Sequence, residues 1–369
     1  MKVCFLLGNF TSNGGIGRVT SILVNEMVKR RDMEIYTLAY ARSNKPPLYV
    51  LDEAVHTDGL FPSSISMRKA FFKNAVGRLV NYIRRNGIEI LVACGSLYFP
   101  MAVFAARRAK IKCVCWDHTG PTVTTDHAFQ AFSRKIGAKR SDVNAVLTKA
   151  AKTYYDMHLR ESSKNIVMYN PIDAGALAAA TDYSSKSHRI LAVGRLSYPK
   201  NFEAMIRVAQ QVLVAYPDWT WDVYGEGPLR QDLERSIAEA GLSDRFFLRG
   251  QVNDLYERYS AYSFIVMTSR YEGFPMTLLE ASANGLPMVS YDVETGPNEI
   301  ITDGQNGFLI PFGDECGMRD AVEKLIRDEA LRVRFSQGSK ATSKEFELSV
   351  TVDAWLDLFR NLINKGEEK

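Results

Sequence analysis

The chain has 369 residues, of which 46% are hydrophobic and 24% charged, and its formal net charge at pH 7 is +4. This composition is ordinary for a globular protein, and the length favours two domains. No apolar run approaches the ~20 residues that cross a bilayer, so no membrane-spanning helix is expected. The apolar run Lys2–Leu7 is too short for a signal peptide and is interpreted as a first strand.

The charge is distributed unevenly. Residues 1–173 contain 25 lysines and arginines against 13 acidic residues, whereas residues 174–369 contain 21 against 29. This change supports a boundary between an N-terminal domain, 1–173, and a C-terminal domain, 174–351, with a linker at residues 170–173. It also predicts that the basic half meets an anionic partner.

The five cysteines lack the spacing of zinc ligands. They are expected to be reduced and mostly in the core, as in a cytoplasmic protein.

Short apolar runs alternate with helix-length amphipathic segments. Strands are predicted at residues 3–7, 35–39, 88–93, 112–116, 145–147 and 165–168, and then at 189–193, 220–224, 246–248, 264–267, 288–291 and 307–310. Helices are predicted at 19–31, 202–215, 229–240 and 348–364, where apolar residues recur at helical spacing. This alternation predicts an α/β fold of two Rossmann-like doubly wound domains that face each other across a cleft.

The first turn after a strand, residues 8–18, is rich in glycine and includes Gly14, Gly15 and Gly17. Glycines there let the backbone approach a ligand closely. The spacing is not that of a dinucleotide site, and the Gly-Lys-Ser/Thr sequence of a P-loop is missing. An ordinary flexible turn is the alternative.

A basic, aromatic stretch covers residues 71–85. Its residues of interest are Phe71, Phe72, Lys73, Val76, Arg78, Leu79, Tyr82, Ile83, Arg84 and Arg85. Apolar anchors with flanking cations fit an anionic membrane surface, whereas a core helix with a solvated charged face fits equally well.

His118 directly follows the predicted strand at 112–116. At that edge it could bond a substrate hydroxyl or carry its own backbone to a reacting carbon, or it could be a structural histidine. Asp117 beside it could be a base or a turn former.

Two further turns follow strands in the second half. After residues 189–193 come Gly194, Arg195, Lys200 and Asn201, where two cations could neutralise a diphosphate leaving group without a metal, unless they are solvated surface cations. The turn Gly225-Glu226-Gly227 could border a nucleotide or be a plain turn.

The most informative segment runs from Ser269 to Glu280. A strand, the turn Gly273-Phe274-Pro275-Met276-Thr277 and an apolar helix follow one another, which is how α/β proteins present bare backbone N–H groups to a phosphate. Glu272 and Glu280 bracket this turn and suit sugar or ribose hydroxyls. Phosphate and polyhydroxyl recognition side by side indicates a sugar nucleotide.

A metal site is not expected. Asp292-Val293-Glu294 resembles a carboxylate pair for a metal only loosely, and the chain contains no Asp-x-Asp.

Taken in order, these motifs resemble those of family 4 retaining glycosyltransferases with the GT-B fold, over nearly the whole chain. The most specific element is Glu272-x7-Glu280, supported by Gly14-Gly15, His118, Gly194-Arg195 with Lys200-Asn201, Gly225-Glu226-Gly227 and Asn306-Gly307. The run from Phe274 to Ala281 is similar to that of bacterial lipopolysaccharide and capsule transferases that use UDP-sugars. In such proteins the last helix, here about 352–369, returns to the N-terminal domain.

The resemblance implies a role for each residue. Arg195 and Lys200 would bind the donor diphosphate and stabilise the leaving group, with the backbone of 273–277 around the distal phosphate. Glu280 would take ribose hydroxyls, Glu272 sugar hydroxyls, and His118 would lie beside the anomeric carbon. Gly14 and Gly15 would close over the phosphates, with Gly17, Asn201, Gly225 and Glu226 also at the donor.

The implied enzyme transfers a hexose or N-acetylhexosamine from a UDP-sugar to a glycan or lipid-linked acceptor. It is expected to need no metal and to have no nucleic-acid partner. Peripheral membrane contact through the basic N-terminal half and a cytoplasmic location are expected. A sugar-nucleotide epimerase or hydrolase is the leading alternative; an NAD-dependent oxidoreductase and a non-catalytic partner of another transferase are weaker ones.

Overall fold

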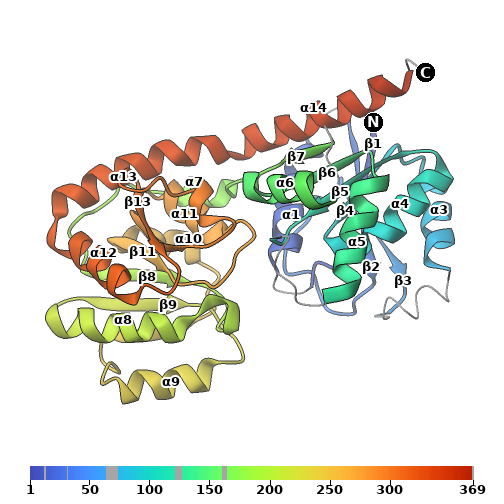
Figure 1. Cartoon of the computed structure of the whole chain (residues 1–369). Coiled ribbons are helices and arrows are strands. Elements are labelled where there is room, and N and C mark those ends of the chain that lie inside the picture. Colours follow the sequence, from blue (N-terminus) through green and yellow to red (C-terminus); the bar gives the residue numbers. More distant parts are fainter. Residues whose placement is uncertain (12–13, 31, 64–73, 121–126, 160–163, 368–369) are drawn as a thin grey trace. The chain divides into compact units, whose positions relative to one another are not determined.

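The computed structural model describes residues 1–11, 14–30, 32–63, 74–120, 127–159 and 164–367. The chain divides into two compact units (Figure 1): unit 1 comprises Met1–Pro171 with Leu348–Lys369, and unit 2 comprises Ile172–Glu347. Each unit is built on one parallel sheet, which confirms the predicted α/β class with a doubly wound domain in each half.

Unit 1 has a sheet of seven described strands in the order β3-β2-β1-β4-β5-β6-β7. The strands are β1 (Lys2–Leu7), β2 (Glu34–Ala41), β3 (His56–Phe61), β4 (Ile90–Cys94), β5 (Lys112–Asp117), β6 (Val143–Val146) and β7 (Asn165–Val167). Phe5 of β1 lies between Thr37 of β2 and Val92 of β4. The chain order reverses between β1 and β4, and parallel sheets bind ligands beyond the carboxyl ends of strands at such a point.

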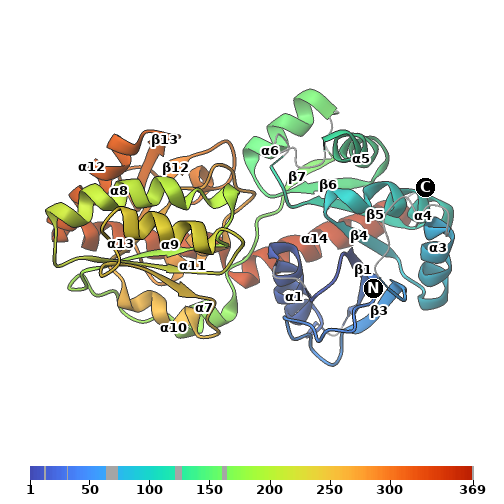
Figure 2. The ribbon, with the colours of Figure 1, turned by 90° about the horizontal axis from the view of Figure 1, so that it is seen from below.

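The helices of unit 1 cover both faces of this sheet. Those that the structure describes are α1 (Gly15–Met27), α3 (Ala75–Asn86), α4 (Phe99–Ala109), α5 (His127–Arg140), α6 (Lys149–Tyr154) and α14 (Leu348–Glu367), with short turns η1 (Ser96–Tyr98) and η2 (Tyr155–Leu159). The fully buried Trp355 of α14 packs against Phe5 and Trp116, with ring centroids 6.3 and 4.9 Å apart. Figure 2 shows α14 alongside the strands of unit 1, so the end of the chain completes the N-terminal core.

Unit 2 repeats the topology, with the strand order β10-β9-β8-β11-β12-β13. Its strands are β8 (Arg189–Val193), β9 (Thr220–Tyr224), β10 (Phe246–Gly250), β11 (Phe264–Met267), β12 (Met288–Asp292) and β13 (Gly307–Pro311). Its helices are α7 (Ala174–Ala179), α8 (Phe202–Ala215), α9 (Arg230–Glu239), α10 (Leu255–Arg258), α11 (Met276–Ala283), α12 (Glu315–Arg327) and α13 (Glu329–Ser343), with turns η3 (Tyr198–Lys200), η4 (Tyr259–Ala261), η5 (Pro297–Glu299) and η6 (Lys344–Phe346). The switch point lies between β8 and β11.

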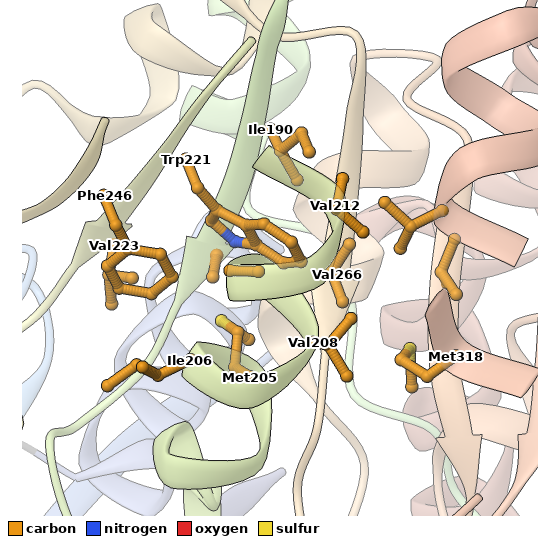
Figure 3. Packing of buried hydrophobic residues seen from close by; sticks show 14 of the residues in the cluster. Ile190, Met205, Ile206, Val208, Val212, Trp221, Val223, Phe246, Val266 and Met318 are labelled. Atoms are coloured by element: carbon orange, nitrogen blue, oxygen red, sulfur yellow. The ribbon is translucent and has the colours of Figure 1, made fainter. Parts of the chain in front are cut away.

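The packing of the unit 2 core explains why its strands appear in the sequence as apolar runs. Trp221 and Val223 of β9 face Met205 and Val208 of α8 in one buried cluster (Figure 3). Asp222, between them on the strand, points to the opposite face because successive strand residues alternate. There it is fully buried and accepts hydrogen bonds from Arg189, Arg249 and Tyr262.

The largest differences between prediction and structure in unit 1 are one missed strand and one helix start. Strand β3 was not predicted, because His56–Phe61 is half polar and contains Gly59, whose hydrogen allows the Arg42 side chain to lie against the strand. Helix α1 begins at Gly15, four residues before its predicted start, since the glycines that suggested a loop form its first turn.

The basic stretch at 71–85 is, where described, a core helix. Leu79, Tyr82 and Ile83 of α3 are buried in the unit 1 core, whereas Arg84 and Arg85 are exposed. The predicted apolar anchors at these positions are therefore unavailable to a membrane, and residues 71–73 lie outside the described part of the chain.

Within the described residues, no helix combines the length and apolarity that a bilayer span requires. Four of the five cysteines are buried, and Cys316 is exposed.

Candidate active site

The candidate site forms where two loops of unit 2 meet at the switch point. The loop after β8 supplies Lys200, and the loop after β11 supplies Glu272. Lys200 Nζ lies 2.6 Å from Glu272 Oε1, and the two side chains are 21% and 11% exposed. Two residues 72 positions apart, both expected in the site on sequence grounds, thus form a partly buried ion pair.

The turn that carries Lys200 is held by the end of β11. Thr268 donates its hydroxyl hydrogen bond to the carbonyls of Lys200 and Asn201, at 3.2 and 3.0 Å. Asn201 adopts a left-handed φ of 52°, which ends η3 and starts α8. The Lys200 stem passes close above Gly194, where an added Cβ would lie 3.3 Å from it. Lys200 is therefore directed by backbone contacts as well as by Glu272.

The turn Gly225-Glu226-Gly227 packs directly on the Arg195 loop. The Leu196 amide donates to the carbonyl of Glu226 at 3.0 Å. A Cβ on Gly225, whose φ is 144°, would meet the Gly194 carbonyl oxygen at 1.9 Å, so only glycine fits. The Glu226 carboxylate pairs with Arg230 at 2.8 Å. Two motifs recognised separately in the sequence therefore form one surface.

The turn before α11 is fixed from the opposite side. Gly296, with a φ of 104°, lets the loop after β12 lie against Pro275 and Gly273, and the Thr295 hydroxyl donates to the carbonyl of Glu272. Pro275 caps α11 with its backbone only. The side chains of Phe274 and Met276 are buried, so the backbone of residues 273–277 is the part of this turn that suits a ligand.

The cations of the site differ in how they are compensated. Arg195 is exposed and, within the described residues, forms no ion pair. Arg270, which the sequence reasoning missed, lies with its guanidinium 4.5 Å from the centroid of the Tyr198 ring and donates from Nε to the Tyr198 carbonyl at 3.3 Å. It too has no carboxylate partner among the described residues. Its position between Ser269 and Glu272 was the available signal.

Three polar atoms around these loops are buried without a hydrogen-bond partner in the described structure: Asn201 Oδ1, Ser269 Oγ and Thr277 Oγ1. Buried polar groups are normally paired, so such a group calls for a ligand or water. Two hydroxyls and one amide oxygen, on loops that also carry Lys200 and Glu272, match a ligand with both phosphate and hydroxyl oxygens.

Glu280 lies deeper than the resemblance implied. Its side chain is fully buried, and Oε2 accepts a hydrogen bond of 2.7 Å from the hydroxyl of Tyr259, which is also fully buried. A ribose hydroxyl would reach this carboxylate only after the atoms that cover it move aside.

In unit 1, the glycine turn lies beyond the carboxyl end of β1. Gly14 caps α1, and a Cβ on Gly14 or Gly15 would meet no described atom within 4 Å. Packing therefore does not demand glycine at these two positions. A Cβ on the buried Gly17 would lie 3.4 Å from the Asn9 carbonyl oxygen, an ordinary van der Waals contact, so packing does not demand glycine there either. Gly15 and Gly17 lie in the first turn of α1, and Gly14 and Gly15 are exposed.

His118 and Asp117 have separate roles at the end of β5. The Asp117 carboxylate is buried and accepts hydrogen bonds from Arg134 Nε at 2.7 Å, from the Tyr155 hydroxyl at 2.8 Å, and from Thr119. This pairing disfavours Asp117 as a base and makes it the anchor of the loop. His118 packs on Trp116 at 4.0 Å between centroids, and its buried Nε2 has no described partner.

Burial lowers the pKa of His118 to about 3, against an opposing effect of Asp117, so the folded protein holds a neutral imidazole. The unfolded chain gains a proton below about pH 6.5, which costs the folded state free energy as the pH falls from there. Between pH 7 and pH 5 we expect wild type to lose about 2 kcal/mol more unfolding free energy than His118→Gln. Urea titrations at the two pH values measure this; parallel losses would contradict it.

Among the described residues, no cluster of three His, Cys, Asp or Glu side chains could hold a metal ion. Asp292 is exposed and accepts a hydrogen bond from Asn298 at 3.0 Å.

Two family models match the chain in succession. The model described as Glycosyltransferase Family 4 matches residues 13–175, and the model described as Glycosyl transferases group 1 matches residues 177–342. The chain belongs to the family 4 glycosyltransferases.

Several proteins resemble this glycosyltransferase over nearly its whole length. The amylovoran biosynthesis glycosyltransferase AmsD of Erwinia amylovora is 27% identical over 97% of this chain and 99% of its own. An uncharacterized glycosyltransferase of Haemophilus influenzae is 23% identical over 96% and 98%. The crystal structure of Anabaena Alr3699/HepE in complex with UDP and glucose aligns with a TM-score of 0.83, at 17% identity over 98% and 99% of the chains. This likeness confirms the GT-B fold of the glycosyltransferase.

Proposed function

We propose that this glycosyltransferase moves a hexose or N-acetylhexosamine from a UDP-sugar to a glycan acceptor with retention of the anomeric configuration. The acceptor is a lipid-linked oligosaccharide, a lipopolysaccharide or a capsule precursor in bacterial surface polysaccharide synthesis. The name of AmsD, an amylovoran biosynthesis enzyme, supports the pathway class, and the UDP and glucose bound to HepE support the donor.

The observation that carries the proposal is the ion pair between Lys200 and Glu272 at the switch point of unit 2. An ammonium group suits phosphate oxygens, and a carboxylate suits sugar hydroxyls. Because the two groups lie 2.6 Å apart, they suit the part of a sugar nucleotide where the diphosphate joins the sugar.

The charges of the site agree with a diphosphate. Glu272 offsets the charge of Lys200, which leaves Arg195 and Arg270 as cations without a described carboxylate partner. A nucleoside diphosphate sugar carries one negative charge on each phosphate, so these two arginines balance it. We therefore add Arg270 to the donor-binding residues.

The hard step is the departure of the nucleoside diphosphate. The bond between the anomeric carbon and the diphosphate breaks, the acceptor oxygen bonds to the same face, and the acceptor proton passes to the donor β-phosphate. Preorganised cations stabilise the charge that develops. The start of α11 adds at most ~2 kcal/mol through its dipole, so Lys200 and Arg195 are assigned the larger share.

The remaining expected roles are part of the proposal. Glu280, hydrogen-bonded to Tyr259, binds the ribose hydroxyls once the atoms that cover its carboxylate move aside. Gly225 and Glu226 border the nucleotide. In unit 1, His118 contacts the sugar as a neutral imidazole, and Gly14 and Gly15 contact phosphate. The protein works at the cytoplasmic face of the membrane, in contact with anionic lipid.

A thermal-shift screen of UDP-, GDP- and ADP-sugars tests the donor. We expect UDP-sugars to raise the melting temperature, because a ligand that binds only the folded state stabilises it by mass action. Lys200→Ala is the matched control and should reduce the shift. A shift with GDP-mannose and none with any UDP-sugar would overturn the donor assignment. Donor turnover that no glycan acceptor accelerates would instead favour an epimerase or hydrolase.

We also expect transfer to proceed without a divalent metal, because the described site offers cations and no carboxylate cluster. Activity after dialysis against EDTA should match untreated enzyme within about twofold, whereas loss of a metal that stabilises the leaving group would cost orders of magnitude. Recovery that requires added Mg²⁺ or Mn²⁺ would refute metal independence.

A further inference from the structure

Unit 1 exposes aromatic side chains on two adjacent helices. Of the four exposed phenylalanines among the described residues, Phe104 lies on α4, and Phe129 and Phe132 lie on α5, with exposed fractions of 40%, 41% and 54%. Phenylalanine is normally buried, and a cluster of exposed rings marks an interaction surface.

These two helices and their neighbour α3 carry charge of one sign. Within their bounds, α3, α4 and α5 contain nine lysines and arginines and no aspartate or glutamate. Arg134 is buried against Asp117, and the other eight are exposed. A solvated helix face usually mixes both signs, so this composition points to an anionic partner.

Helical spacing places Phe129, Phe132, Lys139 and Arg140 on one face of α5, and contacts join α5 to α4 and α4 to α3. The Arg140 guanidinium of α5 lies 5.6 Å from the centroid of Phe104 on α4. On the other side of α4, Arg84 of α3 donates to the carbonyl of Arg108 at 3.2 Å. Figures 1 and 2 show α3, α4 and α5 as neighbours on the sheet of unit 1.

The aromatic end of this surface lies at the carboxyl edge of the sheet. Ser133 contacts the carbonyl of Ser96, just past β4, and Arg134 contacts Asp117 at the end of β5. The turn of α5 that precedes these residues, with Phe129 and Phe132, therefore extends beyond the strand ends, on the edge where His118 lies.

We propose that Phe104, Arg107, Phe129, Phe132, Lys139 and Arg140, the aromatic–basic surface, dock the protein on an anionic lipid bilayer. The rings of Phe129 and Phe132 enter the boundary between headgroups and acyl chains, and the cations contact lipid phosphates. This inference rests on the proposed function, because docking would bring the enzyme to a membrane-borne acceptor. The aromatic–basic surface takes the place of residues 71–85 as the expected membrane contact.

Vesicle sedimentation of the full chain, without donor or acceptor, tests the docking. We expect binding to phosphatidylcholine vesicles that contain about one quarter phosphatidylglycerol, little binding to pure phosphatidylcholine, and weaker binding in high salt. Arg107→Gln/Lys139→Gln/Arg140→Gln should lower the partition coefficient about 100-fold, at about fivefold per cation. Phe129→Ser/Phe132→Ser should lower it at least tenfold and leave the salt dependence unchanged.

The matched control is Arg235→Gln/Arg327→Gln/Arg334→Gln, three exposed cations of unit 2, which should bind vesicles like wild type. Equal losses in both triple variants, or equal binding to both kinds of vesicle, would overturn the proposal. Binding to a soluble anionic polysaccharide without vesicle binding would also overturn it. Because no turnover is measured, failure here leaves the proposed transfer reaction standing, and the donor screen can fail without affecting the docking.

Discussion

Lys200→Ala should lower the rate of glycosyl transfer about 100- to 1,000-fold, while the far-ultraviolet circular dichroism spectrum of the protein stays unchanged. The substitution removes a cation from the departing diphosphate, and one preorganised charge-stabilising group is typically worth that much. It also leaves Glu272, only 11% exposed, without its partner at 2.6 Å. Initial rates at saturating donor measure the loss in kcat.

The unpaired carboxylate of Glu272 offers a second explanation for the loss of activity. The double variant Lys200→Ala/Glu272→Gln distinguishes it from loss of the Lys200 cation. If the missing cation causes the loss, the double variant stays as inactive as the single one. Recovery to near wild-type rates would show that Lys200 only neutralises Glu272. Lys324→Ala, on the far helix α12, is the matched control and should retain full activity.

Arg134→Met should destabilise unit 1 by about 3–5 kcal/mol, because it leaves a buried carboxylate without its counter-charge. Asp117 and Arg134 are 2% and 3% exposed, and no solvent replaces the lost partner. The two units need not unfold together, so hydrogen exchange resolved to β5 and α5 is the appropriate measurement. Protection in unit 2 should be unchanged.

Asp117→Asn/Arg134→Met should regain part of that stability, since a neutral amide costs less to bury unpaired than a carboxylate. Arg235→Met, at an exposed position, should change the unfolding free energy by no more than about 0.5 kcal/mol. If Arg134→Met changed the unfolding free energy as little as Arg235→Met does, the importance of the buried pair would be contradicted.

The elements that were predictable are those with a local signal. The apolar runs at β8, β9 and β11 have their predicted bounds because each strand is largely buried. Helix α8 has its predicted bounds because its buried residues recur at helical spacing. Strand β3 escaped prediction because its residues are half polar. In α3 two environments stayed open, because periodicity places Leu79 and Tyr82 on one face without showing whether protein or lipid covers it.

The candidate site divides in the same way. Residue types and spacing were enough to single out Lys200 and Glu272, since a cation, a glycine turn and a carboxylate after strands carry their chemistry in the sequence. Their pairing, the stacking of Arg270 on Tyr198 and the burial of Glu280 under Tyr259 join residues 72, 72 and 21 positions apart. Such contacts exist because parallel crossovers bring β11 beside β8, and side-chain packing then determines which charges meet and which stay open to a ligand.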